Sequence, residues 1–197
     1  MSVYSNATNI SGGKMKRLFA VVLMVLILTG AMAQQSGQQA PVMELSFTFT
    51  RQSGSATNQF AVWIENAQGQ HIKTLNATRW TANDGWRRRP TSIPIWVKQS
   101  GVSDMTRAQI DAVSSATPRT GILTYTWDGT DNRSMAVPAG QYTLFIEGTL
   151  RWENQALFRA PILLGQGAAM AEVSVEYSGD SAAERSMISD VSVRVLR

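Results

Sequence analysis

Two stretches of alternating apolar and polar residues, joined by a turn-rich connection, constrain this chain most. Apolar and aromatic residues alternate with threonines over 121–127, and Tyr142, Leu144 and Ile146 share one face of the second stretch. A period of two gives a strand one buried face and one wetter face. The connection holds breakers such as Asp128-Gly129, which are typical of turns between strands. The pattern predicts a large β-hairpin over 121–148, at the centre of an antiparallel sheet, with Glu147 on its wetter face.

The same alternation recurs along the rest of the chain. Further strands are predicted over 45–49, 60–65, 72–75, 156–164, 173–177 and 191–195. They are separated by turn residues, and little of the chain has a helical period. The sequence therefore predicts an all-β fold: an immunoglobulin-like antiparallel β-sandwich of seven or eight strands.

The N-terminal segment has the pattern of a secretory signal peptide. Three basic residues (Lys14, Lys16 and Arg17) precede the apolar run 18–28, and small residues follow up to Ala33. This run is too short to span a bilayer, which needs about 20 apolar residues. We expect cleavage after Ala33, a flexible tail over 34–41 and a single domain over 42–197. The product is then periplasmic or secreted with no membrane span, and either Met1 or Met15 is the true start.

Charge and cysteine content exclude several classes of protein. The chain carries a formal charge of +4. Removal of the leader takes away its three basic residues, so the formal charge of the remaining chain is +1. A nearly neutral exported domain is a poor match to nucleic acid. The chain has no cysteine, so disulfides, zinc–thiolate sites and cysteine nucleophiles are excluded.

The segment 76–120, called here the tryptophan–arginine insertion, lacks strand alternation. A short helix is predicted over 104–113, with Ser103 at its N-cap. Segments of this length without strands are functional or disordered, and three tryptophans argue against disorder. We therefore expect an ordered functional excursion from the sandwich.

The basic and aromatic residues of the insertion form the first candidate site. Guanidinium groups pair with phosphates or carboxylates, and indoles offer stacking faces. These residues predict a surface for a ligand or a partner, such as a flavin or a redox protein. The alternative is that the tryptophans pack the insertion onto the sandwich while the arginines are solvated. The residues are Arg79, Trp80, Trp86, Arg87, Arg88, Arg89 and Trp96.

Two resemblances to known families follow from these segments. The 60–75 strand pair and the W-D-G connection resemble the Ig-like domain of the flagellar hook-capping protein, a likeness of fold alone. The residues that match are Gly69, Thr74, Leu75, Trp127, Asp128, Gly129, Asp131, Gly140 and Tyr142, and Ser134 departs from the pattern. The order of the leader, the A-V-W-I-E strand, the insertion, the D-A-V-S segment and the W-D-G connection is similar to domain of unknown function 2271, a family of predicted periplasmic proteins. That resemblance implies an association with extracytoplasmic flavin or iron-related redox systems and no established enzymatic activity.

Residues 111–117 form the second candidate site. They resemble the D-x-x-S/T-G-A-T motif, at which a transferase of ApbE type esterifies a threonine with the phosphate of FMN. Asp111, Ser114, Ala116 and Thr117 match the motif, and Ser115 stands where it has glycine. The resemblance implies possible covalent FMN at Thr117, whereas the plain alternative is a polar loop that ends a helix before a proline.

The remaining polar residues predict no metal site or catalytic centre. Asp128, Asp131 and Asn132 lack the spacing of a calcium loop and are expected to form Asx-turns. His71 is the only histidine, and no nucleophile or ligand set accompanies it. We expect a non-enzymatic accessory or interaction module of an extracytoplasmic redox or metal-acquisition system. The alternative is an electron carrier with FMN on Thr117.

Overall fold

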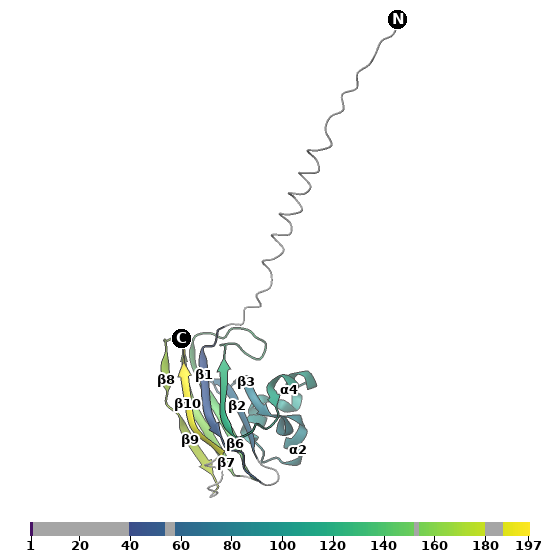
Figure 1. The fold of residues 1–197 in the computed structure, drawn as a ribbon, viewed down its shortest axis with the longest axis vertical. Coiled ribbons are helices and arrows are strands. Elements are labelled where there is room, and N and C mark those ends of the chain that lie inside the picture. Colours follow the sequence, from purple (N-terminus) through teal and green to yellow (C-terminus); the bar gives the residue numbers. More distant parts are fainter. Residues whose placement is uncertain (2–39, 54–57, 152–153, 180–186) are drawn as a thin grey trace. The chain divides into compact units, whose positions relative to one another are not determined.

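The structure is a computed structural model that describes Met1 and residues 40–53, 58–151, 154–179 and 187–197 (Figure 1). Apart from Met1, these residues belong to one compact unit, Ala40–Arg197. The predicted signal peptide (1–33) and most of the predicted tail (34–41) lie outside the described residues.

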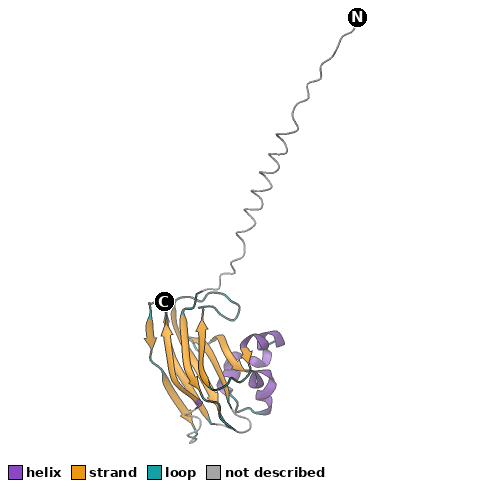
Figure 2. Ribbon diagram, in the orientation of Figure 1, coloured by secondary structure: helices purple, strands orange, loops and turns teal. Residues whose placement is uncertain are grey.

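The described chain is mainly β-structure, arranged in two sheets (Figure 2). The four-stranded sheet has the order β5-β1-β10-β8, and the six-stranded sheet has the order β4-β3-β2-β6-β7-β9. All pairings are antiparallel except the short β3–β4 pair. The predicted β-sandwich is confirmed, with eight strands of five residues or more and two shorter ones, β4 and β8, among the described residues. In chain order the elements are β1 (Met43–Phe49), β2 (Gln59–Asn66), β3 (His71–Thr78), η1 (Thr81–Gly85), α2 (Trp86–Arg88), α3 (Pro94–Ser100), η2 (Val102–Asp104), α4 (Arg107–Val113), β4 (Ser114–Ser115), β5 (Gly121–Trp127), β6 (Gly140–Thr149), β7 (Gln155–Leu164), β8 (Ala169–Ala171), β9 (Ser174–Ser178) and β10 (Ile188–Val195).

The main core lies between the inner faces of the two sheets. Phe47 and Phe49 of β1 pack against Phe60 of β2, with ring centroids 5.9 and 5.4 Å apart. Trp127 is fully buried in the same core and packs edge-on against Tyr142 at 5.2 Å. The inward residues are those that the alternating pattern places on one face of each strand.

The predicted hairpin over 121–148 is wrong, because its two arms lie in different sheets. β5 pairs with β1, whereas β6 pairs with β2 and β7. Residues 128–139 therefore cross from one sheet to the other. Alternation determines which side chains of a strand are buried, but it does not determine the neighbour of that strand.

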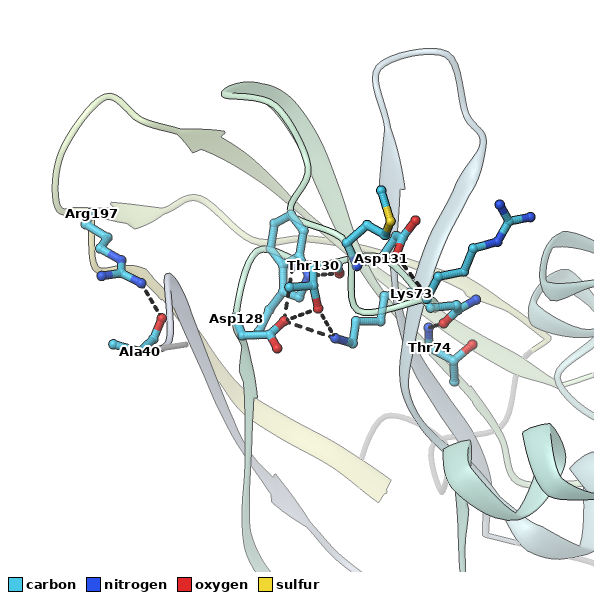
Figure 3. Close-up of polar contacts among 11 residues, drawn as sticks. Ala40, Lys73, Thr74, Asp128, Thr130, Asp131 and Arg197 are labelled. Carbon is cyan, nitrogen blue, oxygen red and sulfur yellow. Dashed lines mark hydrogen bonds and ion pairs between the residues drawn. The ribbon is translucent and has the colours of Figure 1, made fainter. Parts of the chain in front are cut away.

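The crossing segment is held by hydrogen bonds from its own polar residues (Figure 3). Asp128 Oδ1 accepts from the backbone of Thr130, and Asp131 Oδ1 accepts from the backbones of Arg133 and Met135. The Asx-turns predicted at both aspartates are confirmed. Asn132 instead accepts from the backbone N–H of Thr74 on β3, at 3.3 Å.

An ion pair joins the crossing segment to the other sheet. Lys73 Nζ on β3 lies 3.0 Å from Asp128 Oδ1 and also donates to Thr130 Oγ1 (Figure 3). Burial opposes ionisation of Asp128, but hydrogen bonds from Thr130 and Lys73 outweigh it and hold the pKa of that carboxyl below its ordinary value. The W-D-G sequence thus serves to fasten the two sheets together.

A second hydrophobic core lies on the outer face of the six-stranded sheet, under the insertion. Trp63 of β2 stacks on Phe145 of β6 at 5.0 Å, and Trp96 of α3 is fully buried in the same cluster. The helices gather beside this sheet (Figure 2). β2 is consequently buried on both faces, and the sandwich has a third, partly helical layer.

The insertion is ordered, as predicted, but its helices differ from the prediction. β3 continues to Thr78, so the irregular part begins at residue 79. The predicted helix 104–113 starts later, at Arg107, where Thr106 and Gln109 form a reciprocal capping box. Ser103 lies inside η2 and does not cap α4. Helix α3 was not predicted at all.

Candidate functional site

A pocket of about 250 Å³ lies at the start of the insertion, where β3 ends and η1 and α2 follow. It is lined by Arg79, Trp80, Asn83, Asp84, Gly85 and Arg88. Arg79 and Arg88 are exposed, and 42 % of Trp80 is accessible to solvent. The pocket therefore presents two cationic forks and the surface of one indole.

The loop that shapes this pocket is anchored to the sheet by buried hydroxyl groups. Thr78 and Thr81 both donate to Gln59 Oε1, at 2.7 and 2.9 Å. Thr81 also exchanges a 2.7 Å hydrogen bond with Ser92. The two ends of the loop are thus tied together and to β2, which gives the pocket a rigid base.

Gly85 allows the loop to turn tightly against Trp80. A Cβ atom at this position would lie 2.1 Å from the Trp80 carbonyl oxygen, a distance that no side chain can accept. Asp84, just before it, has a left-handed φ of 63°, which a short polar residue tolerates better than most. The close approach determines how the Trp80 ring lies at the pocket wall.

The remaining arginines support the indoles. The Arg87 guanidinium lies 4.4 Å from the centre of the Trp86 ring and pairs with Asp84 at 3.0 Å. Arg89 is buried, lies 5.7 Å from the Trp80 ring centre and donates to Ser92 Oγ. Because Asp84 is paired with Arg87, the charge facing the pocket is mainly that of Arg79 and Arg88.

The seven residues of the first candidate site are therefore divided by the structure. Arg79, Trp80 and Arg88 line the pocket, whereas Trp86, Arg87 and Arg89 brace it from its flanks. Trp96 does not line the pocket and is fully buried in the second core. Sequence reasoning missed Asn83, Asp84 and Gly85, whose roles depend on the shape of the loop.

The three residues of the second candidate site lie along α4 and the segment after it. Asp111 is exposed on α4 and pairs with Arg107 at 3.4 Å. Ser114 begins β4 with its hydroxyl buried, and Thr117 is half-buried in a segment with neither helix nor strand. Ser115 fastens this segment to β3 through a 2.7 Å hydrogen bond to Asn76 Oδ1.

Glu147 is fully buried beneath the insertion, so its predicted position on a wetter face is wrong. Its carboxylate accepts hydrogen bonds from the backbone N–H groups of Ile95 and Trp96, at 3.1 and 2.8 Å. These N–H groups belong to the first turn of α3, which has no side-chain cap of its own. Burial raises the pKa of Glu147 to about 7, and the two N–H groups oppose that rise.

His71 belongs to a second polar chain under the insertion. Trp96 Nε1 donates to Thr74 Oγ1 at 3.0 Å, and this hydroxyl also contacts His71 Nε2 at 2.8 Å. Burial lowers the pKa of His71 to about 4, so the imidazole is neutral at pH 7. His71 therefore has a structural role, since it contacts the Thr74 hydroxyl that binds the Trp96 indole.

A larger cleft of about 380 Å³ lies near the junction of β7 and β8. Its lining includes the exposed apolar residues Leu163 and Met170, and Glu172 is its one charged lining residue. Ligand sites combine apolar walls with several convergent polar groups. The larger cleft has the apolar walls, but it has no cationic side chain, whereas the smaller arginine pocket combines two guanidinium groups with one indole and is the candidate site for an anionic group.

Residues 42–182 match the profile of a protein family, domain of unknown function 2271 (DUF2271), described as a predicted periplasmic protein. The chain belongs to this family. The matched residues contain every strand except β10, together with the crossing segment and the whole insertion, so the DUF2271 match includes the candidate pocket. A search of curated proteins found no match to the chain.

Two further observations bear on the DUF2271 chain. Within the described residues, no helix is long and apolar enough to cross a membrane. The same part of the chain contains no group of three or more histidine, aspartate or glutamate side chains that could hold a metal ion.

Proposed function

We propose that this DUF2271 protein is a non-enzymatic periplasmic interaction module that holds an acidic segment of a partner protein in the arginine pocket. The partner would belong to an extracytoplasmic redox or metal-acquisition system. The observation that carries the proposal is the convergence of Arg79, Arg88 and the accessible Trp80 ring on one rigid pocket.

The chemistry of these residues favours a carboxylate beside an apolar or planar group. Guanidinium groups bind carboxylates through paired, charge-assisted hydrogen bonds, and an indole face accepts an aromatic ring. Tryptophan and arginine are also the residues that dominate binding energy at protein interfaces. The acid in the lining, Asp84, is paired with Arg87 at 3.0 Å, which reduces its repulsion of an anion.

The size of the pocket favours a side chain over a free cofactor. Its volume of about 250 Å³ is below the roughly 300–1,000 Å³ of most small-molecule sites. A glutamate with a neighbouring aromatic residue fits this space better than a complete flavin nucleotide. We therefore favour docking of a partner protein over binding of a flavin as the function of this pocket.

We expect the double variant Arg79→Ala/Arg88→Ala to weaken binding of an acidic probe about tenfold or more. Charge-assisted hydrogen bonds are worth about 1.5–3 kcal/mol each, and the double variant removes both forks. The probe is a fluorescent peptide of four glutamates and one tyrosine, and its affinity is measured by anisotropy. Because both arginines are exposed, the melting temperature should change little.

Two variants serve as controls. Arg133→Ala removes an exposed arginine of the crossing segment and should bind the peptide as the unmodified protein does. Arg79→Lys/Arg88→Lys keeps the positive charges but loses the paired hydrogen bonds of the guanidinium groups. Its affinity for the peptide should lie between that of the unmodified protein and that of the double alanine variant. An affinity unchanged in the double alanine variant would contradict the proposal, as would a loss matched by Arg133→Ala.

The second candidate is an electron carrier with FMN esterified to Thr117. One observation favours it: Thr117 is partly accessible in an irregular segment, where a transferase could reach its hydroxyl. The test is the intact mass of protein exported from a host that contains the transferase. A mass increased by one FMN, absent in Thr117→Ala, would support this candidate, and an unmodified mass would exclude it.

A further inference from the structure

The outer edge of β5 is the one long strand edge of the sandwich that carries none of the usual protection against pairing. Within the described residues β5 ends the four-stranded sheet, with β1 on its only paired side. That pairing runs in unbroken register over all seven residues of β5. The strand contains no charge, no proline and no bulge, although edge strands are normally blunted by such features.

The other three terminal strands of the two sheets, among the described residues, are blunted. β4 has two residues and β8 has three. β9 carries Glu176 in its centre, in a 2.7 Å ion pair with Arg159 of the neighbouring strand. The contrast singles out β5 as an edge able to accept another strand.

Several apolar side chains of β5 are also left partly exposed at its unpaired edge. Ile122 is 77 % exposed on the outer face. Leu123 and Tyr125 pack against the main core but are only partly buried. A strand added at this edge would cover the open sides of all three residues.

We propose that β5 pairs antiparallel with β5 of a second copy of this chain, about a two-fold axis at Thr124, joining two four-stranded sheets into one. In this register Thr124 faces its own copy. Leu123 faces Tyr125 of the second copy, and Ile122 faces Thr126. Pairs of aromatic, aliphatic and threonine side chains across antiparallel strands are each worth about 0.2–1 kcal/mol, and no like charges meet.

The charges that flank the strand are complementary in the same register. Arg119 precedes β5 and is exposed. Asp128 follows it and is partly exposed, and its contacts with Lys73 and Thr130 all use Oδ1, which leaves Oδ2 for a second cation. The two-fold axis brings Arg119 of each copy to the end of the strand pair at which Asp128 of the other copy lies. Two Arg–Asp pairs are therefore expected, one at each end of the strand pair. This complementarity commits the edge to a second copy in preference to an unrelated strand.

The test is the molecular mass of the protein in solution, measured by analytical ultracentrifugation. An edge-to-edge contact is small, so we expect a reversible dimer with a Kd on the order of 1–100 µM. Thr124→Lys and Thr124→Glu should each be monomeric, since two like charges then meet at the axis. An equimolar mixture of the two variants should dimerise again, because Lys and Glu face each other.

Val175→Lys is the matched control, since it places the same charge on the exposed edge strand β9. It should dimerise as the unmodified protein does, and circular dichroism should show that all variants keep their fold. Three results would each overturn the proposal: an unmodified protein that stays monomeric at about 1 mM, roughly ten times the weakest expected Kd, a Thr124→Lys variant that still dimerises, or a mixture that stays monomeric.

Discussion

Trp96→Ala is expected to lower the free energy of unfolding by about 3–5 kcal/mol, the usual cost of removing a buried aromatic side chain. Trp96 is fully buried between the insertion and the outer face of the sheet, and its Nε1 donates to Thr74. The substitution leaves a cavity and removes the hydrogen bond from Nε1 to the Thr74 hydroxyl, which keeps only its contact with His71 Nε2. Urea unfolding followed by circular dichroism gives the change directly.

Trp80→Ala provides the comparison for this experiment. Trp80 lies on the same insertion but is exposed, so its removal should cost less than about 1 kcal/mol. If Trp96→Ala were as mild as Trp80→Ala, the insertion would not be packed on the sheet. The account of a third layer would then fail.

The second large effect is the dependence of stability on pH, in which the buried Glu147 and the half-buried His71 oppose each other. The pKa of Glu147 rises from 4.5 to about 7 on folding, so the stability that it contributes below pH 4.5 is lost as the pH rises to 7. That loss is about 3 kcal/mol. The pKa of His71 falls from 6.5 to about 4, so its contribution is gained as the pH rises over nearly the same interval.

We expect single substitutions to reveal the two opposing slopes. In Glu147→Gln the free energy of unfolding should rise between pH 4 and 6.5, because only His71 still titrates there. In His71→Gln it should fall between pH 4.5 and 7, because only Glu147 does. Urea unfolding at intervals of one pH unit measures both slopes, whatever the absolute stability of each variant.

The double variant Glu147→Gln/His71→Gln is the control and should lose both slopes. Asp128 and Asp131 do not interfere, since their pKa values are held below the ordinary value of 3.8. Parallel curves for the unmodified protein and Glu147→Gln would show that the Glu147 carboxyl is not buried in the folded protein.

The sequence predicted the faces of the strands well, because local alternation reports burial directly. Phe47, Phe60, Trp127 and Tyr142 all lie in the main core, as the alternation requires. It failed on the neighbour of β5, because pairing depends on residues far away in the chain. The same limit applies to Glu147, whose burial comes from an insertion about 50 residues earlier in the chain.

Helix α3 was missed for a related physical reason. Its N-cap position is Ile93, a β-branched residue in a left-handed conformation with φ 42°, which no local rule anticipates. The capping acceptor is the Glu147 carboxylate on another strand. By contrast, the start of α4 could have been predicted from the sequence, since Thr106 and Gln109 form a standard capping box. The prediction of Ser103 as the N-cap overlooked this pair.

The candidate site could be predicted in composition but not in arrangement. The cluster of arginines and tryptophans identified the insertion as the place to look. Which of these residues face solvent depends on the tight turn at Gly85 and on the burial of Trp96 in the second core. Residue type alone therefore could not separate Trp80 from Trp96.

The central claim, that the arginine pocket is the binding surface, is tested most directly by nuclear magnetic resonance of the tryptophan indole N–H groups. The acidic peptide of four glutamates and one tyrosine is titrated into the labelled protein. The account predicts that the Trp80 signal shifts progressively, while the signals of the buried Trp63, Trp96 and Trp127 stay in place. A Trp80 signal that does not move, or equal shifts at the buried tryptophans, would contradict it.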